Sequence, residues 1–233
     1  MRKPHSLLYF SEFGRAMVEL GTLPLVWPWL ASTVNERPHV VLVIPGFTTS
    51  GRSTNVLRKT LRSLGYEAHT WNQGINFGVR RELFNGVTKE LDRLYDKYDA
   101  KVSLIGQSLG GVYARQLAKI RSDKVCQVIT LGSPINDPEG RGSHASNLYR
   151  ILNPEQLVDD EASWPFSDWI LDEPPAVPTT VIYSRYDGIC HWETCVQNGE
   201  FDHVENIEVI GSHIGMAINP VIQYLIADRL SQR

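Results

Sequence analysis

The stretch Lys101-Val102-Ser103-Leu104-Ile105-Gly106-Gln107-Ser108-Leu109-Gly110 decides the fold of this chain. Its first half is a largely apolar run of strand formers, and residues 112–120 after it have the composition of a helix. The Gly-x-Ser-x-Gly spacing at the junction is typical of a sharp turn from strand to helix, because the two glycines leave room for the crossing backbones. The middle residue, Ser108, then takes a strained conformation and projects its hydroxyl clear of the sheet. The sequence therefore predicts a nucleophile elbow at Ser108.

Strand and helix patterns alternate from residue 38 onward, which is the signature of a parallel sheet covered on both faces. Strands are expected at 39–44, 66–71, 101–105, 125–131, 180–184 and 207–210, and helices at 54–64, 80–98, 112–120 and 219–230. We therefore expect an α/β fold with a mostly parallel sheet of about six strands. Residues 1–233 read as a single domain, because neither an internal repeat nor a low-complexity segment interrupts them.

The alternation lapses between about Ile135 and Val177, where turn formers are mixed with large apolar residues. Such a long excursion in a compact domain is typical of a lid or cap insertion. Trp164 and Trp169 lie in it, and we expect them to line an apolar acyl or alkyl pocket. The alternative is that both pack in a small core of the insertion itself.

An N-terminal segment, residues 1–37, precedes the first expected strand. Its apolar residues at helical spacing predict an amphipathic helix: Leu7, Phe10, Phe13, Met17 and Leu20. We expect this helix and the Trp27/Trp29 segment to pack on the domain near its pocket, and the alternative is a patch in peripheral contact with lipid. Residues 23–31 are too short and too interrupted by prolines to cross a bilayer, and they make a poor signal peptide, so we expect a cytoplasmic protein.

Composition excludes some function classes. The 233 residues are 42% hydrophobic and 21% charged, with a formal net charge of -3, so nothing indicates a nucleic-acid partner. Three cysteines are too few for a disulfide scaffold, and Cys126 falls in a strand pattern where we expect it to be buried. Cys190 and Cys195 are close enough along the chain to bridge, and the sequence leaves their redox state open, as it does the oligomeric state.

The elbow predicts where its catalytic partners lie. In an open parallel sheet, functional groups gather at the carboxyl ends of the strands, and the order for this arrangement is serine, acid, histidine. Asp187 follows the expected strand at 180–184, and His213 follows the one at 207–210. We therefore expect His213 to accept the proton of Ser108 and Asp187 to orient the imidazole.

The developing oxyanion needs two backbone donors. One is the amide of Leu109, directly after the nucleophile, and the other is the amide of Phe47, in the turn after the first strand.

Other residues compete for these roles. Asp159, Asp160, Asp168, Asp172 and Asp202 are rival acids that we interpret as surface charges, and His144 is a rival base that no strand aims at the site. Cys190, His191, Cys195 and His203 lack the usual spacing of a zinc site, so no metal is expected. The chain has neither a P-loop nor a Gly-x-Gly-x-x-Gly fingerprint, and we expect no cofactor.

Five segments together resemble the α/β-hydrolase superfamily, and more narrowly small bacterial serine carboxylesterases and lipases. They are residues 44–47 (Ile-Pro-Gly-Phe), 106–111 (Gly-Gln-Ser-Leu-Gly-Gly), 130–134, 184–188 (Ser-Arg-Tyr-Asp-Gly) and 211–215 (Gly-Ser-His-Ile-Gly). The resemblance covers residue 38 to the C-terminus and implies the α/β-hydrolase fold with the same triad and oxyanion donors. Many lipases carry a histidine beside the nucleophile, where this chain has Gln107.

The function expected from these residues is hydrolysis of small-molecule or lipid-like carboxylic esters through an acyl-Ser108 intermediate. One alternative is an acyltransferase that uses the same triad with an alcohol as acceptor. A more remote alternative is a non-catalytic lipid-binding protein that keeps the fold.

Overall fold

The computed structural model describes residues 2–32, 39–137, 141–154 and 169–232. The strands are β1 (Val40–Ile44), β2 (Glu67–Thr70), β3 (Val102–Gln107), β4 (Val125–Leu131), β5 (Thr179–Tyr183) and β6 (Val204–Glu208). The helices are α1 (Ser6–Ala31), α2 (Asn55–Ser63), α3 (Arg81–Tyr98), α4 (Leu109–Ile120), α5 (Ser146–Leu152), α6 (Trp192–Cys195) and α7 (Pro220–Ser231). All six strands pair in parallel, in the order β2-β1-β3-β4-β5-β6. The predicted fold class is confirmed.

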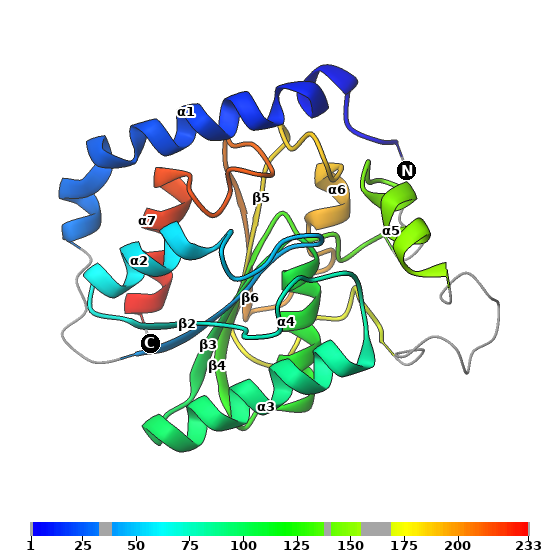
Figure 1. Cartoon of the computed structure of the whole chain (residues 1–233). Helices are drawn as coiled ribbons and strands as arrows, with labels where there is room; N and C mark the ends of the chain where they lie inside the picture. Colours follow the sequence, from blue (N-terminus) through cyan, green and yellow to red (C-terminus); the bar gives the residue numbers. More distant parts are fainter. Residues whose placement is uncertain (1, 33–38, 138–140, 155–168, 233) are drawn as a thin grey trace.

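The sheet carries one apolar core on each face. Alternate residues of β1, such as Val41 and Val43, pack with α2 and α7, whereas Val40 and Leu42 pack with α3 and α4. Figure 1 shows α2 and α7 lying away from α3 and α4. Because the central strands are buried on both faces, they are largely apolar, which is why the sequence pattern located them to within one or two residues.

The expected bounds of the last strand, 207–210, are wrong. This strand, β6, begins three residues earlier and occupies Val204–Glu208. This strand lies at the edge of the sheet and pairs only with β5, and its burial is partial. An edge strand with the polar residues Glu205, Asn206 and Glu208 has no continuous apolar run to mark it. The chain still leaves β6 five residues before His213, so the base keeps its place at the carboxyl edge.

The N-terminal helix differs most from expectation. It continues to Ala31 through Pro24 and Pro28, although a proline inside a helix costs about 3 kcal/mol. Its apolar stripe faces outward, because Phe10 is 81% and Phe13 69% exposed, while Glu12 is only 2% exposed. The helix packs on the domain, as expected, but it does so through the face that carries Glu12 and not through the apolar stripe. Figure 1 shows α1 running along one side of the molecule, beside α7.

The described part of the insertion contains α5 and the segment that leads into β5. Residues 155–168, with Trp164, lie outside the described residues. Among the described residues, no helix combines the length and the apolar character needed to cross a membrane.

Candidate active site

Ser108 lies at the junction of β3 and α4 with φ 51° and ψ −125°. A side chain at Gly106 would lie 2.2 Å from the Gly110 carbonyl oxygen, and one at Gly110 would lie 2.3 Å from the Ile44 carbonyl oxygen. Both contacts are with backbone, which has no room to move, so these positions require glycine. The Ser108 amide donates to the Leu131 carbonyl at 2.8 Å, which ties the strained turn to β4.

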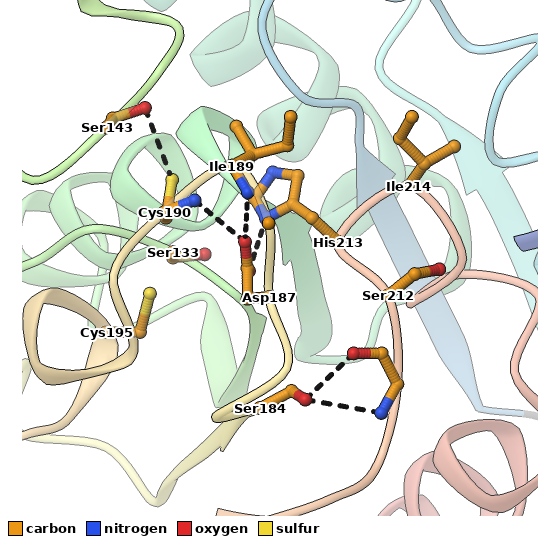
Figure 2. Close-up of polar contacts among 12 residues, drawn as sticks. Ser133, Ser143, Ser184, Asp187, Ile189, Cys190, Cys195, Ser212, His213 and Ile214 are labelled. Atoms are coloured by element: carbon orange, nitrogen blue, oxygen red, sulfur yellow. Dashed lines mark hydrogen bonds and ion pairs between the residues drawn. The ribbon is translucent and has the colours of Figure 1, made fainter. Parts of the chain in front are cut away.

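Asp187 and His213 form a buried pair at the ends of β5 and β6. His213 Nδ1 lies 2.5 Å from Asp187 Oδ2, and the two side chains are 8% and 1% exposed. The other carboxylate oxygen of Asp187 accepts the amides of Ile189 at 2.8 Å and Cys190 at 2.7 Å. Figure 2 shows the carboxylate held between these amides and the imidazole ring. The carboxylate is therefore fixed in orientation, and with Nδ1 as donor the Nε2 atom is left as the acceptor.

The surroundings of His213 change its basicity. Burial is the largest influence and lowers its pKa, but the charge and hydrogen bond of Asp187 and the charge of Glu12 together outweigh burial. The pKa of His213 is therefore raised above its ordinary value. The imidazolium that forms when His213 accepts a proton is stabilised at this site.

The loops that carry the acid and the base are bonded to one another. Ser184 Oγ donates to the Gly211 carbonyl at 2.8 Å and accepts the Gly211 amide at 3.2 Å, and these are the two contacts drawn at Ser184 in Figure 2. It also accepts the Tyr186 amide at 3.1 Å. Gln107 Nε2 donates to the His213 carbonyl at 3.0 Å, so the residue beside the elbow holds the base loop.

Within the described residues, Ser108 Oγ makes no hydrogen bond, and neither do the amides of Phe47 and Leu109. A side chain at Gly46 would lie 3.2 Å from Ser108 Cβ, so the β1 turn runs directly beside the nucleophile. Catalytic hydrogen bonds are often long without substrate and tighten when it binds. The Leu109 amide directly follows Ser108 and the Phe47 amide lies in the neighbouring turn, so their role as oxyanion donors stays a prediction.

Two further residues hold the Phe47 turn. Asn76 is fully buried, its Nδ2 donates to the Pro45 carbonyl at 2.9 Å, and its own carbonyl accepts the Thr48 amide at 2.7 Å. Tyr149, from α5 of the insertion, places its ring 5.2 Å from that of Phe47. The insertion therefore reaches the turn that carries one expected oxyanion donor.

Trp169 packs at the other end of the insertion. Its ring lies 5.2 Å from that of Phe84 in α3 and 6.4 Å from that of Tyr113 in α4. These contacts place it against the core on that face of the sheet. A role of Trp169 in the substrate pocket stays a prediction, as does that of Trp164.

The rival residues lie elsewhere or outside the described residues. His144 contacts the ring of Tyr9 and the carbonyl of Pro4, while Asp172 and Asp202 are exposed. Asp159, Asp160 and Asp168 fall outside the described residues.

Cys190 and Cys195 are both buried free thiols, and burial raises the pKa of each. Cys126 is partly buried, with its sulfur 3.2 Å from Ser103 Oγ. In the part of the chain that the structure describes, no group of three His, Cys, Asp or Glu residues is arranged to hold a metal ion.

Sequence reasoning missed the contacts of Glu12, Glu19 and Asn76, and it noted Gln107 beside the nucleophile without foreseeing its bond to the His213 carbonyl. Glu12 and Glu19 are two turns apart on α1, and the helical spacing places them on one face. That spacing was visible in the sequence, but nothing there indicated which face would meet the domain.

Comparison with known proteins supports the same fold. A family described as "PGAP1-like alpha/beta domain" matches residues 65–163, which is less than half of the chain. A search of curated proteins finds no match.

Several solved structures are similar at low sequence identity. Lipase B of Aspergillus fumigatus superposes with a TM-score of 0.63 at 17% identity, over 85% of this chain and 54% of that one. The chain therefore spans about half the length of that lipase. A structure of the metagenome-derived lipolytic enzymes LipS and LipT superposes with a TM-score of 0.61 at 13% identity, over 86% of this chain and 96% of that one. The lipase BlEst2 of Bacillus licheniformis superposes with a TM-score of 0.58 at 14% identity, over 84% of this chain and 94% of that one. At this level of identity the likeness concerns the fold.

Proposed function

The chain has the α/β-hydrolase fold, and from that premise we propose that it is a serine carboxylesterase or lipase that works through an acyl-Ser108 intermediate. The observation that carries the proposal is the buried pair of Asp187 and His213, 2.5 Å apart, at the same sheet edge as the strained Ser108. The lipase and esterase neighbours support hydrolase chemistry on this fold.

The proposed reaction has two halves. Ser108 Oγ attacks the ester carbonyl, its proton passes to His213 Nε2, and the oxyanion is stabilised by the amides of Phe47 and Leu109. His213 then gives the proton to the leaving alcohol as the bond from the acyl carbon to the alkoxy oxygen breaks. In the second half, a water molecule attacks the acyl carbon while His213 Nε2 takes a proton from it. The bond from the acyl carbon to Ser108 Oγ then breaks, His213 returns the proton to Oγ, and the acid is released.

The mechanism is tested by Ser108→Ala, measured with p-nitrophenyl esters and with labelling by a fluorophosphonate. We expect turnover to fall by at least about a thousandfold and labelling to disappear. Ser63→Ala is the matched control, because Ser63 Oγ bonds only within α2, to the Thr60 carbonyl at 2.7 Å. Activity of Ser108→Ala within tenfold of the wild type would falsify the mechanism.

We further propose that the ester is lipid-like and is met at a lipid surface. The charged residues of α1 are Glu12, Arg15 and Glu19, and all three bond to the domain. The outer face is left apolar, with exposed Leu7, Phe10, Phe13, Met17, Val18, Leu25 and Trp29. A helix with such a face and tryptophans near one end is suited to lie in a membrane interface.

An open groove beside α1 gives this surface a second feature. It has a volume of about 490 Å³ and lies between α1 and the loops after β5 and β6, and its lining includes Phe10, Val18, Tyr186 and Ile210. The surface that would face lipid is therefore continuous with the loops of the acid and the base.

Flotation with phosphatidylcholine vesicles tests the lipid contact. Burying a phenylalanine contributes roughly 1.5 to 3 kcal/mol, so Phe10→Ser with Phe13→Ser is expected to weaken partitioning by about a hundredfold or more. Ile120→Ser is the control, because Ile120 is 48% exposed at the end of α4, away from this face. A wild type that stays in the aqueous fraction, or a double variant that floats like the control, contradicts the lipid contact.

Hydrolysis and transfer to an alcohol share every step up to the acyl-Ser108 intermediate. Product analysis with a soluble alcohol added separates them, because a hydrolase releases mainly the free acid and an acyltransferase forms the new ester.

A further inference from the structure

We propose that Glu12 is a positioning residue that holds the loops of the candidate acid and base in one arrangement, so that α1 is part of the catalytic apparatus. The proposal rests on the function proposed above. Glu12 is only 2% exposed, and its carboxylate contacts both loops.

The contacts of this carboxylate join two separate loops. Glu12 Oε1 accepts the Gly188 amide at 2.7 Å and the His213 amide at 3.1 Å, and Oε2 accepts the Ile214 amide at 2.9 Å. Gly188 directly follows Asp187, so a single oxygen connects the neighbour of the acid to the base itself. Any relative movement of these loops breaks at least one charge-assisted hydrogen bond, which is the stronger kind.

A second carboxylate extends the same arrangement. Glu19, two turns further along α1, accepts the Ser212 amide at 2.7 Å and the Ser212 hydroxyl at 3.1 Å. The successive amides of residues 212, 213 and 214 therefore all donate to carboxylates of α1. Consecutive amides that converge in this way form an anion-binding concavity, and here the anions belong to the chain itself.

Two glycines fit α1 onto these loops. A side chain at Gly188 would lie 2.5 Å from the backbone of Leu8, and one at Gly215 would lie 1.8 Å from Glu19 Oε2. The glycines that follow the acid and the base in sequence thus leave the space that α1 and its carboxylates occupy. A side chain at either position would push α1 and its carboxylates away from the loops.

The charge of Glu12 acts on the base as well. Two carboxylates influence the His213 ring, Asp187 from the β5 loop and Glu12 from α1, and both favour the imidazolium. Arg15 is the cation beside them, and it is paired with Glu12 at 2.7 Å. Replacing Glu12 by glutamine removes one of these two negative charges, so the pKa of His213 falls.

Glu12→Gln tests both effects, because the amide group can accept from fewer of these donors and carries no charge. We expect kcat on a soluble p-nitrophenyl ester to fall about tenfold to a hundredfold with KM nearly unchanged, because the base is misplaced relative to the nucleophile. The acid limb of the kcat/KM profile should also move to lower pH, and the ring titration of His213, followed by NMR, should move with it.

Glu90→Gln is the matched control. Glu90 is also a nearly buried glutamate on a helix, paired at 2.7 Å with the arginine three residues later, but it bonds to Asn72 in the loop after β2. We expect it to lower the melting temperature while kcat and the His213 titration stay at wild-type values. Should Glu12→Gln fail to fold, Glu12→Asp decides, because it keeps the charge but shortens the reach, and kcat should then fall with little movement of the acid limb.

The outcomes are distinguishable. A folded Glu12→Gln protein, or Glu12→Asp in its place, with wild-type kcat and an unmoved His213 titration overturns the proposal and leaves Glu12 a packing residue. If the wild type hydrolyses no ester, the proposed function fails, but a His213 titration that shifts in Glu12→Gln and not in Glu90→Gln still supports the link between Glu12 and the base.

Discussion

Replacing Asp187 by asparagine is the substitution whose consequence follows most directly from the geometry. One carboxylate oxygen accepts the amides of Ile189 and Cys190 at 2.8 and 2.7 Å, and the other faces His213 Nδ1 at 2.5 Å. In the variant, the two amides select the carbonyl oxygen of the asparagine, since its NH2 group cannot accept them. The NH2 group then faces His213, Nδ1 becomes the acceptor, and the ring proton moves to Nε2.

A neutral His213 in this tautomer presents an N–H to Ser108 and cannot accept the hydroxyl proton. Loss of the correct tautomer costs serine hydrolases of this type about 10⁴ in kcat, so we expect kcat/KM to fall by about 10³ to 10⁴. This corresponds to roughly 4 to 5.5 kcal/mol of lost transition-state stabilisation. The acid limb should also move to lower pH, because burial still lowers the pKa of His213 while the opposing charge of Asp187 is gone.

The assay is kcat/KM on a p-nitrophenyl ester between about pH 5 and 9, beside circular dichroism to verify folding. Asp137→Asn is the control, since Asp137 likewise accepts two backbone amides, of Arg141 and Gly142, but faces no histidine. It should keep activity within about threefold of the wild type. A folded Asp187→Asn protein that retains more than a tenth of wild-type activity would show that another group orients His213.

Three further predictions concern stability and the pocket. Gly110→Ala places a methyl group 2.3 Å from the Ile44 carbonyl oxygen and should destabilise the fold by roughly 2 kcal/mol or more, whereas Gly14→Ala, with open space around it, should be neutral or stabilising in urea unfolding. Folding raises the pKa of His213, so protonated His213 stabilises the folded state fully below about pH 6.5, and this contribution is lost as the pH rises through the raised pKa. The unfolding free energy of the wild type should therefore fall with pH in this range, and His213→Gln should lack that fall. Trp169→Ala should lower the melting temperature, because the ring packs on Phe84 and Tyr113, and it should shift the optimal acyl length on graded p-nitrophenyl esters; an unchanged optimum would leave Trp169 a packing residue only.

Much of the sheet and the candidate site could be predicted because local chemistry determines them. The Gly-x-Ser-x-Gly turn after an apolar strand requires the positive φ found at Ser108, and central strands buried on both faces are marked by their apolar runs. In a parallel sheet the carboxyl ends of the strands share one edge, so the positions of Asp187 and His213 along the chain were enough to predict their contact.

The bounds of β6 could not be predicted in the same way. Its polar, half-exposed residues carry no apolar periodicity, and its place is determined by pairing with β5. The state of Cys190 and Cys195 was likewise open, because a short separation along the chain does not fix the relative direction of two side chains, which here remain free thiols.

For the N-terminal helix, the sequence by itself determines the helical conformation, and the tertiary structure determines which face of the helix is buried. Helical periodicity in residues 7–20 determined that this segment is an amphipathic helix, but it describes the segment alone. Which face turns inward depends on what the rest of the chain presents. The loops after β5 and β6 present backbone amides that need acceptors, and Glu12 and Glu19 supply them, so the charged face is buried and the apolar face is left outside.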